Sequence, residues 1–504
     1  MADRLVIFVH GWSVTDTSTY GELPARLMAE SARRGGPSID VRHIHLGQYV
    51  SFRDEVRLPD ISRAFDFALG AALKEAGPDR RFICIAHSTG GPLVRDWLDR
   101  YYVQPRRVAE CAMSHLIMLA PANFGSALAA MGKTRLASIK SWFGGVEPGL
   151  GVLDWLELGS PESCELNLRW IDDYARLKLG EGRSPLFQFV LSGDAIDRKL
   201  YDHVNPYTGE TGSDGVVRLA SANLNATHIV LEQPTTEQGE ALPTARKRMR
   251  LLTRTSSRRS PRTAFKIIPG KSHAGETMGI LRSVRNDDGA DASVDAILRC
   301  LKVGDAAAYA ALCSAFEAEN ADHQAIANRL EIERVPVLPD RKYFHDPHAM
   351  VVFRLQDIQG IGTPNVNVLL TAGPANDPNQ LPENFLTDRQ FNLRSANLTF
   401  YLNHATLTGC PPIPARNDHG IARAALIPRP PYGLRVVPRE DDRFVEYWMA
   451  EMPANVQNLL PLIAPNETTI IDIRLTRVVR EGVFRFTRQL SPRSFRKTDP
   501  GSPL

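Results

Sequence analysis

The stretch that decides the fold runs Phe82-Ile-Cys-Ile-Ala-His-Ser88-Thr-Gly-Gly-Pro-Leu-Val94. An apolar strand leads into a tight turn of small residues, and a helical pattern follows at once. Such a turn holds the side chain at its apex exposed on a strained backbone when small residues lie two positions before and after it. Those positions hold Ala86, where glycine is usual, and Gly90. The stretch predicts Ser88 as a nucleophile; the alternative is a serine in the strand-to-helix turn of another doubly wound protein.

A second element lies at the start of the chain, where the apolar run Leu5–Val9 ends in His10-Gly-Trp-Ser13. A fully apolar run of this length fits a buried parallel strand. The turn after it can aim a backbone N–H at the oxyanion that develops when Ser88 attacks a carbonyl. The other donor is the N–H of the residue after the nucleophile. By position these amides belong to Trp12 and Thr89, and the alternative is an ordinary strand-to-helix turn.

A serine nucleophile needs an acid and a base, which follow it in that order in this kind of fold. Asp214 stands in a polar, glycine-containing turn ahead of an apolar pair, and His273 follows a strand-like run and a glycine turn. We expect His273 to take the proton of Ser88 and Asp214 to fix the tautomer of the imidazole. The alternatives are Asp194, Asp197 and Asp202 for the acid, and His203 and His228 for the base.

Three segments resemble those of bacterial serine lipases and esterases of the α/β-hydrolase superfamily. Ala86–Gly91 resembles the Ala-His-Ser-x-Gly-Gly turn of small bacterial lipases. Leu119–Ser126 is similar to the segment that follows the next strand in many lipases, and Ser213–Val217 to their acid-bearing loop. The resemblance covers roughly residues 1–300. It implies an α/β-hydrolase fold and ester hydrolysis through an acyl-enzyme.

The first 300 residues alternate between strand-like apolar runs and helical patterns. This alternation predicts an α/β fold with a mostly parallel sheet and helices on both faces. The expected strands are Leu5–Val9, Val41–His45, Arg81–Ile85, His115–Leu119, Leu186–Leu191 and Phe265–Ile268. We expect an α/β-hydrolase domain over residues 1–332.

The segment 124–177 interrupts this alternation of strands and helices, and it contains glycines together with large apolar residues. We expect a cap or lid insertion over the nucleophile, which in lipases exposes an apolar surface for an acyl chain when it opens. The alternative is a cap that packs permanently and only shapes the pocket. The large apolar residues are Trp142, Phe143, Leu153, Trp155 and Leu156.

A second insertion is expected at 227–262, between the acid and the base. His228–Leu231 and Met249–Leu252 predict a β-hairpin on a polar loop, and eight basic residues lie between Arg246 and Arg262 with no Asp or Glu among them. Such a run can contact anionic lipid headgroups, at about 1 kcal/mol per basic residue near a charged bilayer. The alternative is a solvated loop.

After residue 340 the sequence changes character. Short segments alternate apolar and polar residues, with Pro, Gly and Asn clusters between them. This pattern predicts a C-terminal antiparallel β-sandwich domain over residues 340–490, joined by a linker at 335–339. Such modules beside lipase domains often bind lipid or a protein partner, although the fold alone does not establish that role.

Composition narrows the class of protein. A chain of 504 residues is expected to form two domains. The charged fraction of 23% and the net charge of +3 do not indicate that the protein binds nucleic acid or an acidic partner. The six scattered cysteines predict neither a zinc site nor a disulfide framework, and Cys84 is expected in the core. We expect no transmembrane segment and no signal peptide, hence a cytoplasmic protein or one exported without an N-terminal signal.

Together these observations predict a serine hydrolase of the lipase or phospholipase A type, which cleaves carboxylic esters of lipids without a cofactor or a metal. The basic segment and the added β domain slightly favour a phospholipid substrate and contact with an anionic membrane surface. An acyltransferase and a short-chain esterase are chemically close alternatives. A non-catalytic interaction protein with a relict hydrolase fold is the alternative of a different class. The order Ser88, Asp214, His273 argues against it.

Overall fold

The computed structural model describes most of the chain. The described residues are 4–10, 18–45, 54–77, 80–132, 149–174, 185–197, 211–233, 249–287, 289–333, 340–357, 359–362, 366–415, 420–439, 445–479, 494 and 496.

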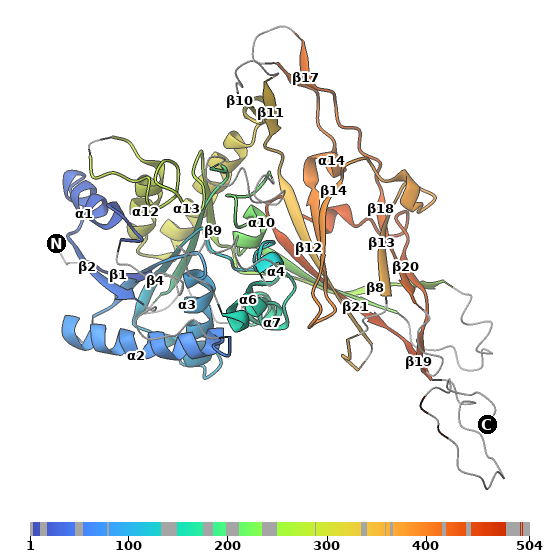
Figure 1. The fold of residues 1–504 in the computed structure, drawn as a ribbon, viewed down its shortest axis with the longest axis horizontal. Helices are drawn as coiled ribbons and strands as arrows, with labels where there is room; N and C mark the ends of the chain where they lie inside the picture. Colours follow the sequence, from blue (N-terminus) through green and yellow to red (C-terminus); the bar gives the residue numbers. More distant parts are fainter. Residues whose placement is uncertain are drawn as a thin grey trace.

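A six-stranded, wholly parallel sheet forms the first layer (Figure 1). Its strands are the expected apolar runs, and β3, β4 and β5 are buried along almost their whole length. Parallel strands covered on both faces need such continuous apolar runs. In spatial order the strands are β2 (Ile39–His45), β1 (Arg4–His10), β3 (Phe82–His87), β4 (Met113–Leu119), β5 (Phe187–Gly193) and β9 (Ala264–Ile268).

Helices cover both faces of this sheet. Side chains alternate across a strand, so Leu5 and Ile7 of β1 enter one core while Val6 and Phe8 enter the other. The first core lies under α2 (Leu58–Ala76) and α3 (Gly90–Leu98). The second lies under α1 (Leu23–Arg33), α12 (Ala292–Leu301) and α13 (Ala306–His323). The expected α/β-hydrolase architecture is thus present.

Further sheets follow in the C-terminal region, and the two largest pack face to face around a third core. The larger has the order β14 (Leu386–Phe391), β15 (Leu398–Asn403), β12 (His348–Asp357), β21 (Thr468–Leu475), β6 (Ala226–Glu232) and β8 (Thr253–Arg259). The smaller has the order β13 (Val366–Ala372), β18 (Tyr432–Pro438), β20 (Ala450–Met452) and β7 (Arg250–Leu251). Most pairs are antiparallel, but β21 pairs in parallel with both β12 and β6, and β20 pairs in parallel with β7, which the sequence did not suggest.

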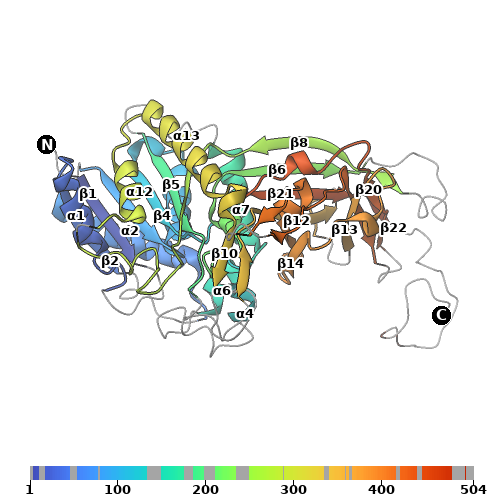
Figure 2. The same cartoon turned by 90° about the horizontal axis from the view of Figure 1, so that it is seen from above.

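The inner strands β15, β12, β21 and β6 of the larger sheet are buried on both faces, and this sheet lies between the hydrolase region and the smaller sheet (Figure 2). Val351 and Phe353 of β12 enter the core between the two C-terminal sheets. Met350 and Val352, which alternate with them, enter the first core together with Tyr401 of β15. The two regions therefore share one continuous interior.

The segment expected as a hairpin insertion at 227–262 needs a correction. Its first strand, β6, pairs with β8 and not with Met249–Leu252, since β7 within that run pairs with β20 instead. β6 also pairs with β21, more than 200 positions later in the chain. The physical reason is burial on both faces: Ile229 and Leu231 enter the third core, while His228 and Val230 on the opposite face are also buried, so the strand is interior. Residues 234–248 of this segment lie outside the described residues.

The cap segment 124–177 contains α4 (Ala129–Gly132), α6 (Leu150–Leu156) and α7 (Pro161–Asp172). Ser160 is the N-cap residue of α7, and its hydroxyl accepts a hydrogen bond from the Ser163 amide. Trp155 and Leu156 are buried in the same core as β3 and α3. Trp142 and Phe143 lie outside the described residues. The described part of this segment packs into the first core.

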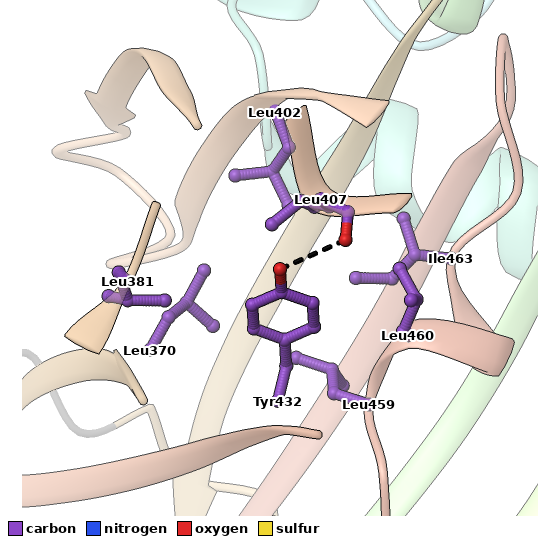
Figure 3. Close-up of a pocket in the computed structure, with 8 residues that line it drawn as sticks. All are labelled: Leu370, Leu381, Leu402, Leu407, Tyr432, Leu459, Leu460 and Ile463. Atoms are coloured by element: carbon purple, nitrogen blue, oxygen red, sulfur yellow. Dashed lines mark hydrogen bonds between the residues drawn. The ribbon is translucent and has the colours of Figure 1, made fainter. Parts of the chain in front are cut away.

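The sandwich interior holds a small apolar cavity of about 10 Å³, lined by Leu370, Leu381, Leu402, Leu407, Tyr432, Leu459, Leu460 and Ile463 (Figure 3). A volume of that size has room for about one water molecule. The Tyr432 hydroxyl donates a hydrogen bond to the Leu407 carbonyl across it, at 2.9 Å. The cavity is a packing gap and offers no space for a lipid.

Shorter elements complete the described structure. They are the π-helical turn Asp99–Val103, the 3₁₀ turns Val108–Glu110, Ile326–Asn328, Pro378–Gln380 and Leu460–Leu462, the helices α10 (Leu219–Ala222) and α14 (His404–Thr408), and the strands β10 (Leu330–Glu333), β11 (Arg341–Phe344), β16 (Ile413–Pro414), β17 (Ile421–Arg423), β19 (Val445–Tyr447) and β22 (Arg477–Val479). The expected linker 335–339 lies outside the described residues. Within the described residues no helix has the length and apolarity to cross a membrane, and no group of His, Cys, Asp and Glu suits a metal ion.

Candidate active site

Ser88 lies at the turn between β3 and α3, on a left-handed backbone with φ of 53°. A residue with a Cβ rarely adopts this conformation, and it costs on the order of 1–3 kcal/mol. The turn is held in place because the Ser88 amide donates to the Leu119 carbonyl at 3.0 Å. Strain at this position is what a strand-to-helix turn imposes on the residue at its apex.

Small residues around Ser88 allow α3 to approach the sheet. A Cβ placed on Gly90 would lie 3.4 Å from the Cβ of Ala86, so alanine is accommodated where glycine is usual. At Gly91 a Cβ would lie 2.6 Å from the Cβ of Pro121, a distance that real Cβ atoms do not show. Gly91 is therefore the position that requires glycine. The sequence pattern pointed to Ala86 and Gly90 for this close approach, and not to Gly91.

The structure brings Ser88, His273 and Asp214 together in a hydrogen-bonded series. The Ser88 Oγ lies 3.0 Å from His273 Nε2, and His273 Nδ1 lies 2.9 Å from Asp214 Oδ2. Asp214 is fully buried and His273 is 6% exposed. The three side chains come from loops that follow three different strands.

Backbone amides fix Asp214 in its loop. Its Oδ1 accepts hydrogen bonds from the amides of Val216 at 3.0 Å and Val217 at 2.7 Å. The His273 amide donates to the Asp214 carbonyl at 2.9 Å, so the acid and the base are linked through main chain as well as side chain. The other oxygen, Oδ2, is left to face His273. This arrangement orients the imidazole for proton transfer at Nε2.

His87, next to Ser88, lies against the base. Its Nε2–H donates to the His273 carbonyl at 3.2 Å, and the two rings lie 4.8 Å apart. Burial, and then the neighbouring His273, hold the pKa of His87 well below its usual value. His87 is therefore neutral at pH 7 and adds no positive charge beside the base.

Of the two residues predicted to donate to the oxyanion, the structure describes only Thr89. Thr89 is the N-cap residue of α3, so its amide belongs to the first turn of that helix, where N–H groups lack partners within the helix. Trp12 lies outside the described residues. The prediction for these two amides therefore remains a prediction.

The alternative acids and bases have other surroundings. Asp194 pairs with His323 at 2.5 Å, and Asp197 accepts from Thr277 at 3.2 Å. His228, on β6, lies between two aspartates, 3.3 Å from Asp172 and 3.2 Å from Asp472. Asp202 and His203 lie outside the described residues. None of the described alternatives is hydrogen bonded to Ser88, His273 or Asp214.

Several residues that hold the acid loop were not identified as such from the sequence. Ser126 donates from its Oγ to the Val216 carbonyl at 2.7 Å. The Tyr401 hydroxyl contacts the Gly212 carbonyl of the same loop, and Arg218, at the end of this loop, lies over the Tyr401 ring. Ser126 ends a segment that already resembled lipases, so a signal existed for it. Nothing in the local pattern links Tyr401 to a loop nearly 190 positions earlier.

A serine on a strand-to-helix turn, followed along one parallel sheet by an aspartate and a histidine, defines a lipase or esterase of the α/β-hydrolase class. No family model and no curated protein matches the chain. Among solved structures it is similar to phospholipase PlaB from Legionella pneumophila, with 38% identity over 98% of each chain and a TM-score of 0.80. The same phospholipase in complex with thio-NAD gives 35% identity over 99% of this chain and 100% of that chain, with a TM-score of 0.78.

The chain belongs to the family of phospholipase PlaB and is a carboxylic ester hydrolase. The class of enzyme and the fold expected from the motifs are confirmed. Identity of this level over the whole chain includes the C-terminal sheets, which the resemblance in sequence to small lipases did not cover.

Proposed function

We propose that the chain is a phospholipase that cleaves a carboxylic ester of a phospholipid, with Ser88 as nucleophile, His273 as base and Asp214 as the orienting acid. The observation that carries this proposal is the hydrogen-bonded series from Ser88 Oγ through His273 to Asp214 Oδ2. The lipid substrate class is supported by the relation to a phospholipase over nearly the whole chain.

The mechanism has two halves. His273 Nε2 takes the hydroxyl proton as Ser88 Oγ bonds to the ester carbonyl carbon, and the resulting oxyanion is held by backbone amides, proposed as those of Trp12 and Thr89. Collapse breaks the ester C–O bond, and the lysophospholipid alcohol leaves with the proton from His273. Water, deprotonated by His273, then attacks the acyl-Ser88 ester and releases a fatty acid.

Asp214 acts on the imidazole. Its Oδ2 accepts from His273 Nδ1–H, which leaves Nε2 free to accept the proton of Ser88, and its negative charge stabilises the imidazolium that forms. An acyltransferase differs only in that an alcohol replaces water in the second half. Product analysis with and without a free alcohol distinguishes the two, because only a transferase makes a new ester.

We also propose contact with an anionic membrane surface. Ion pairs within the protein reduce the number of basic residues that are available for this contact. Arg258, Arg259 and Arg262 pair with Asp172, Glu467 and Glu317. Arg254 is exposed, and Arg246, Lys247 and Arg248 add basic charge in sequence. Sedimentation with phosphatidylglycerol vesicles, compared with phosphatidylcholine vesicles, tests the contact. Binding that is equal for both, or unaffected when residues 246–248 are changed to Gln, contradicts it.

The expected binding of lipid or a partner by residues 340–490 stays a prediction, as does the expected cytoplasmic location or signal-independent export. No contact among the described residues favours a particular partner.

The proposal is tested by Ser88→Ala, with Ser192→Ala as the matched control. Ser192 lies at the end of a neighbouring region of the same sheet, on β5; it is buried, and its hydroxyl has no hydrogen-bond partner among the described residues. Fatty acid release from phospholipid vesicles should fall by about 10⁶-fold in kcat for Ser88→Ala and by less than twofold for the control. Retention of a tenth of the activity by Ser88→Ala would exclude the proposed nucleophile.

A further inference from the structure

The loop that carries Asp214 rests on the larger C-terminal sheet. Tyr401 of β15 is fully buried, and its hydroxyl oxygen lies 3.0 Å from the Gly212 carbonyl oxygen and 3.1 Å from that of Thr211. A single O–H therefore donates to the main chain two and three positions before the acid. The C-terminal sheet thus holds the main chain directly ahead of Asp214.

The fit at Gly212 shows how close this contact is. Gly212 has a φ of 76°, and a Cβ there would lie 2.5 Å from the Tyr401 hydroxyl and 2.9 Å from His348 Nδ1. The backbone of the acid loop thus packs directly on Tyr401 and His348. The His348 ring stacks on that of Tyr401 with centroids 4.6 Å apart, and burial lowers its pKa to about 4, so this support is uncharged at pH 7.

The other end of the loop is held by charge. Arg218, 2% exposed, lies 4.1 Å over the Tyr401 ring and pairs with Asp388 of β14 at 2.5 Å. Asp388 Oδ2 also accepts from Gln390, which in turn donates to the Ala127 carbonyl. A buried guanidinium keeps a fixed position when it is paired and stacked in this way. Both ends of the loop are therefore fixed by strands β14 and β15.

We infer that the C-terminal sheet positions the catalytic acid, with Tyr401 and the Arg218–Asp388 pair as positioning residues for Asp214. This inference rests on the proposed function, because it requires Asp214 to act on His273. It assigns the C-terminal β region a role in turnover itself, in addition to any binding role. Positioning matters because a displacement of about 1 Å at a reacting group can cost about 100-fold in rate.

The variant Tyr401→Phe tests the inference, since it removes one oxygen and keeps the ring under Arg218. Tyr432→Phe is the matched control: Tyr432, on the smaller C-terminal sheet, is buried like Tyr401 and also donates to a main-chain carbonyl, that of Leu407 (Figure 3). With a soluble p-nitrophenyl ester, Tyr401→Phe should lower kcat by roughly 10-fold and change KM by less than twofold. Tyr432→Phe should lower the melting temperature by a similar amount and leave kcat within twofold of wild type.

A double-mutant cycle separates positioning from general stability. If Tyr401 acts through Asp214, Tyr401→Phe should have less than a twofold effect once Asp214→Asn is present. An unchanged kcat in Tyr401→Phe, or an equal loss in both backgrounds, overturns the inference while Asp214 keeps its role. If Asp214→Asn alone retains wild-type activity, the proposed function loses its acid and the inference falls with it.

Asp388→Asn is a second variant that keeps the shape of the side chain and removes its charge. It should lower kcat in the same direction as Tyr401→Phe, and again only when Asp214 is present. Full activity in this variant would remove the Arg218–Asp388 pair from the positioning set.

Discussion

Because Gly91 has no side chain, the helix after Ser88 can pack closely against Pro121. Gly91 lies in the first turn of that helix, and a Cβ there would overlap Pro121. We expect Gly91→Ala to destabilise the protein by about 1–3 kcal/mol, as overpacking of a core does, and to lower activity by displacing Ser88. Denaturant unfolding and ester hydrolysis measure both effects.

Gly70 is the matched control for this change. It is an exposed glycine inside α2, and no atom lies within 4 Å of the position that a Cβ would take. Gly70→Ala should therefore stabilise the helix by up to about 1 kcal/mol. Equal stability for the two variants would show that the packing around Ser88 is looser than described.

Asp214 and Asp194 each have a histidine partner, and the two histidines differ in what they contact. Asp214→Asn should lower turnover by roughly 10⁴-fold, because it favours the wrong tautomer of His273, while Ser88 stays accessible to a fluorophosphonate. Asp194→Asn should be mild, since its partner His323 does not contact Ser88. The reverse order of severity, measured as kcat on a short-chain ester, would assign the acid to Asp194.

The residues of the triad could be predicted from sequence, and those that hold them could not. Ser88, Asp214 and His273 each follow a strand-like run, and chain order then restricts their roles. Tyr401 and Asp388 contact the acid loop from positions 170 to 190 residues later. Such contacts arise from sheet packing, which no local pattern records.

At the scale of elements, the first sheet was predictable because parallel strands buried on both faces are continuous apolar runs. The strand β6 shows the limit. Its apolar residues indicated a strand, but its neighbour β21 lies more than 200 positions away, and only the packed structure shows that it is interior. A charged strand such as β8 also gave no apolar signal, since it is exposed along most of its length.

Helix α6 bears on whether the cap moves. Val152, Leu153, Trp155 and Leu156 are all buried, and at about 2 kcal/mol each their burial contributes roughly 8 kcal/mol. A helix held in this way is a fixed part of the core. The described part of 124–177 therefore favours the permanently packed cap over the lid that opens on a lipid surface.

Trp155→Ala tests this conclusion. As a truncation in the core it should lower the free energy of unfolding by about 3–5 kcal/mol and affect short-chain and long-chain esters equally. Rates on esters of two chain lengths, measured below and above the concentration at which the longer one aggregates, give the comparison. A loss of activity that is confined to aggregated long-chain substrate would instead favour a lid that opens on a lipid surface.

For the whole molecule, buried histidines make stability depend on pH, and His115 and His348 are two of them. Burial lowers the pKa of both His115 and His348 to about 4, whereas an unfolded histidine has a pKa of about 6.5. The unfolded chain therefore binds more protons between these values, and stability falls as the pH drops from about 6.5 toward 4. For each of these two histidines, the free energy of unfolding should be about 2 kcal/mol lower at pH 5 than at pH 7.

Thermal unfolding at pH 5 and pH 7 measures this loss, and His115→Gln isolates one part of it. Glutamine retains a donor for the Val303 carbonyl, which His115 Nε2–H contacts at 2.9 Å, and does not titrate. The variant should lose less stability than wild type between the two pH values. If both proteins show the same pH dependence, protonation of His115 does not lower the stability of the folded state.

The central claim is that Ser88 carries the acyl group, and covalent labelling tests it most directly. Reaction with a fluorophosphonate, followed by peptide mapping by mass spectrometry, should give one adduct per chain on Ser88 of wild type. Fatty acid release from phospholipid vesicles should fall in proportion to the labelled fraction. An adduct on another residue, or full hydrolysis by fully labelled protein, would contradict the account.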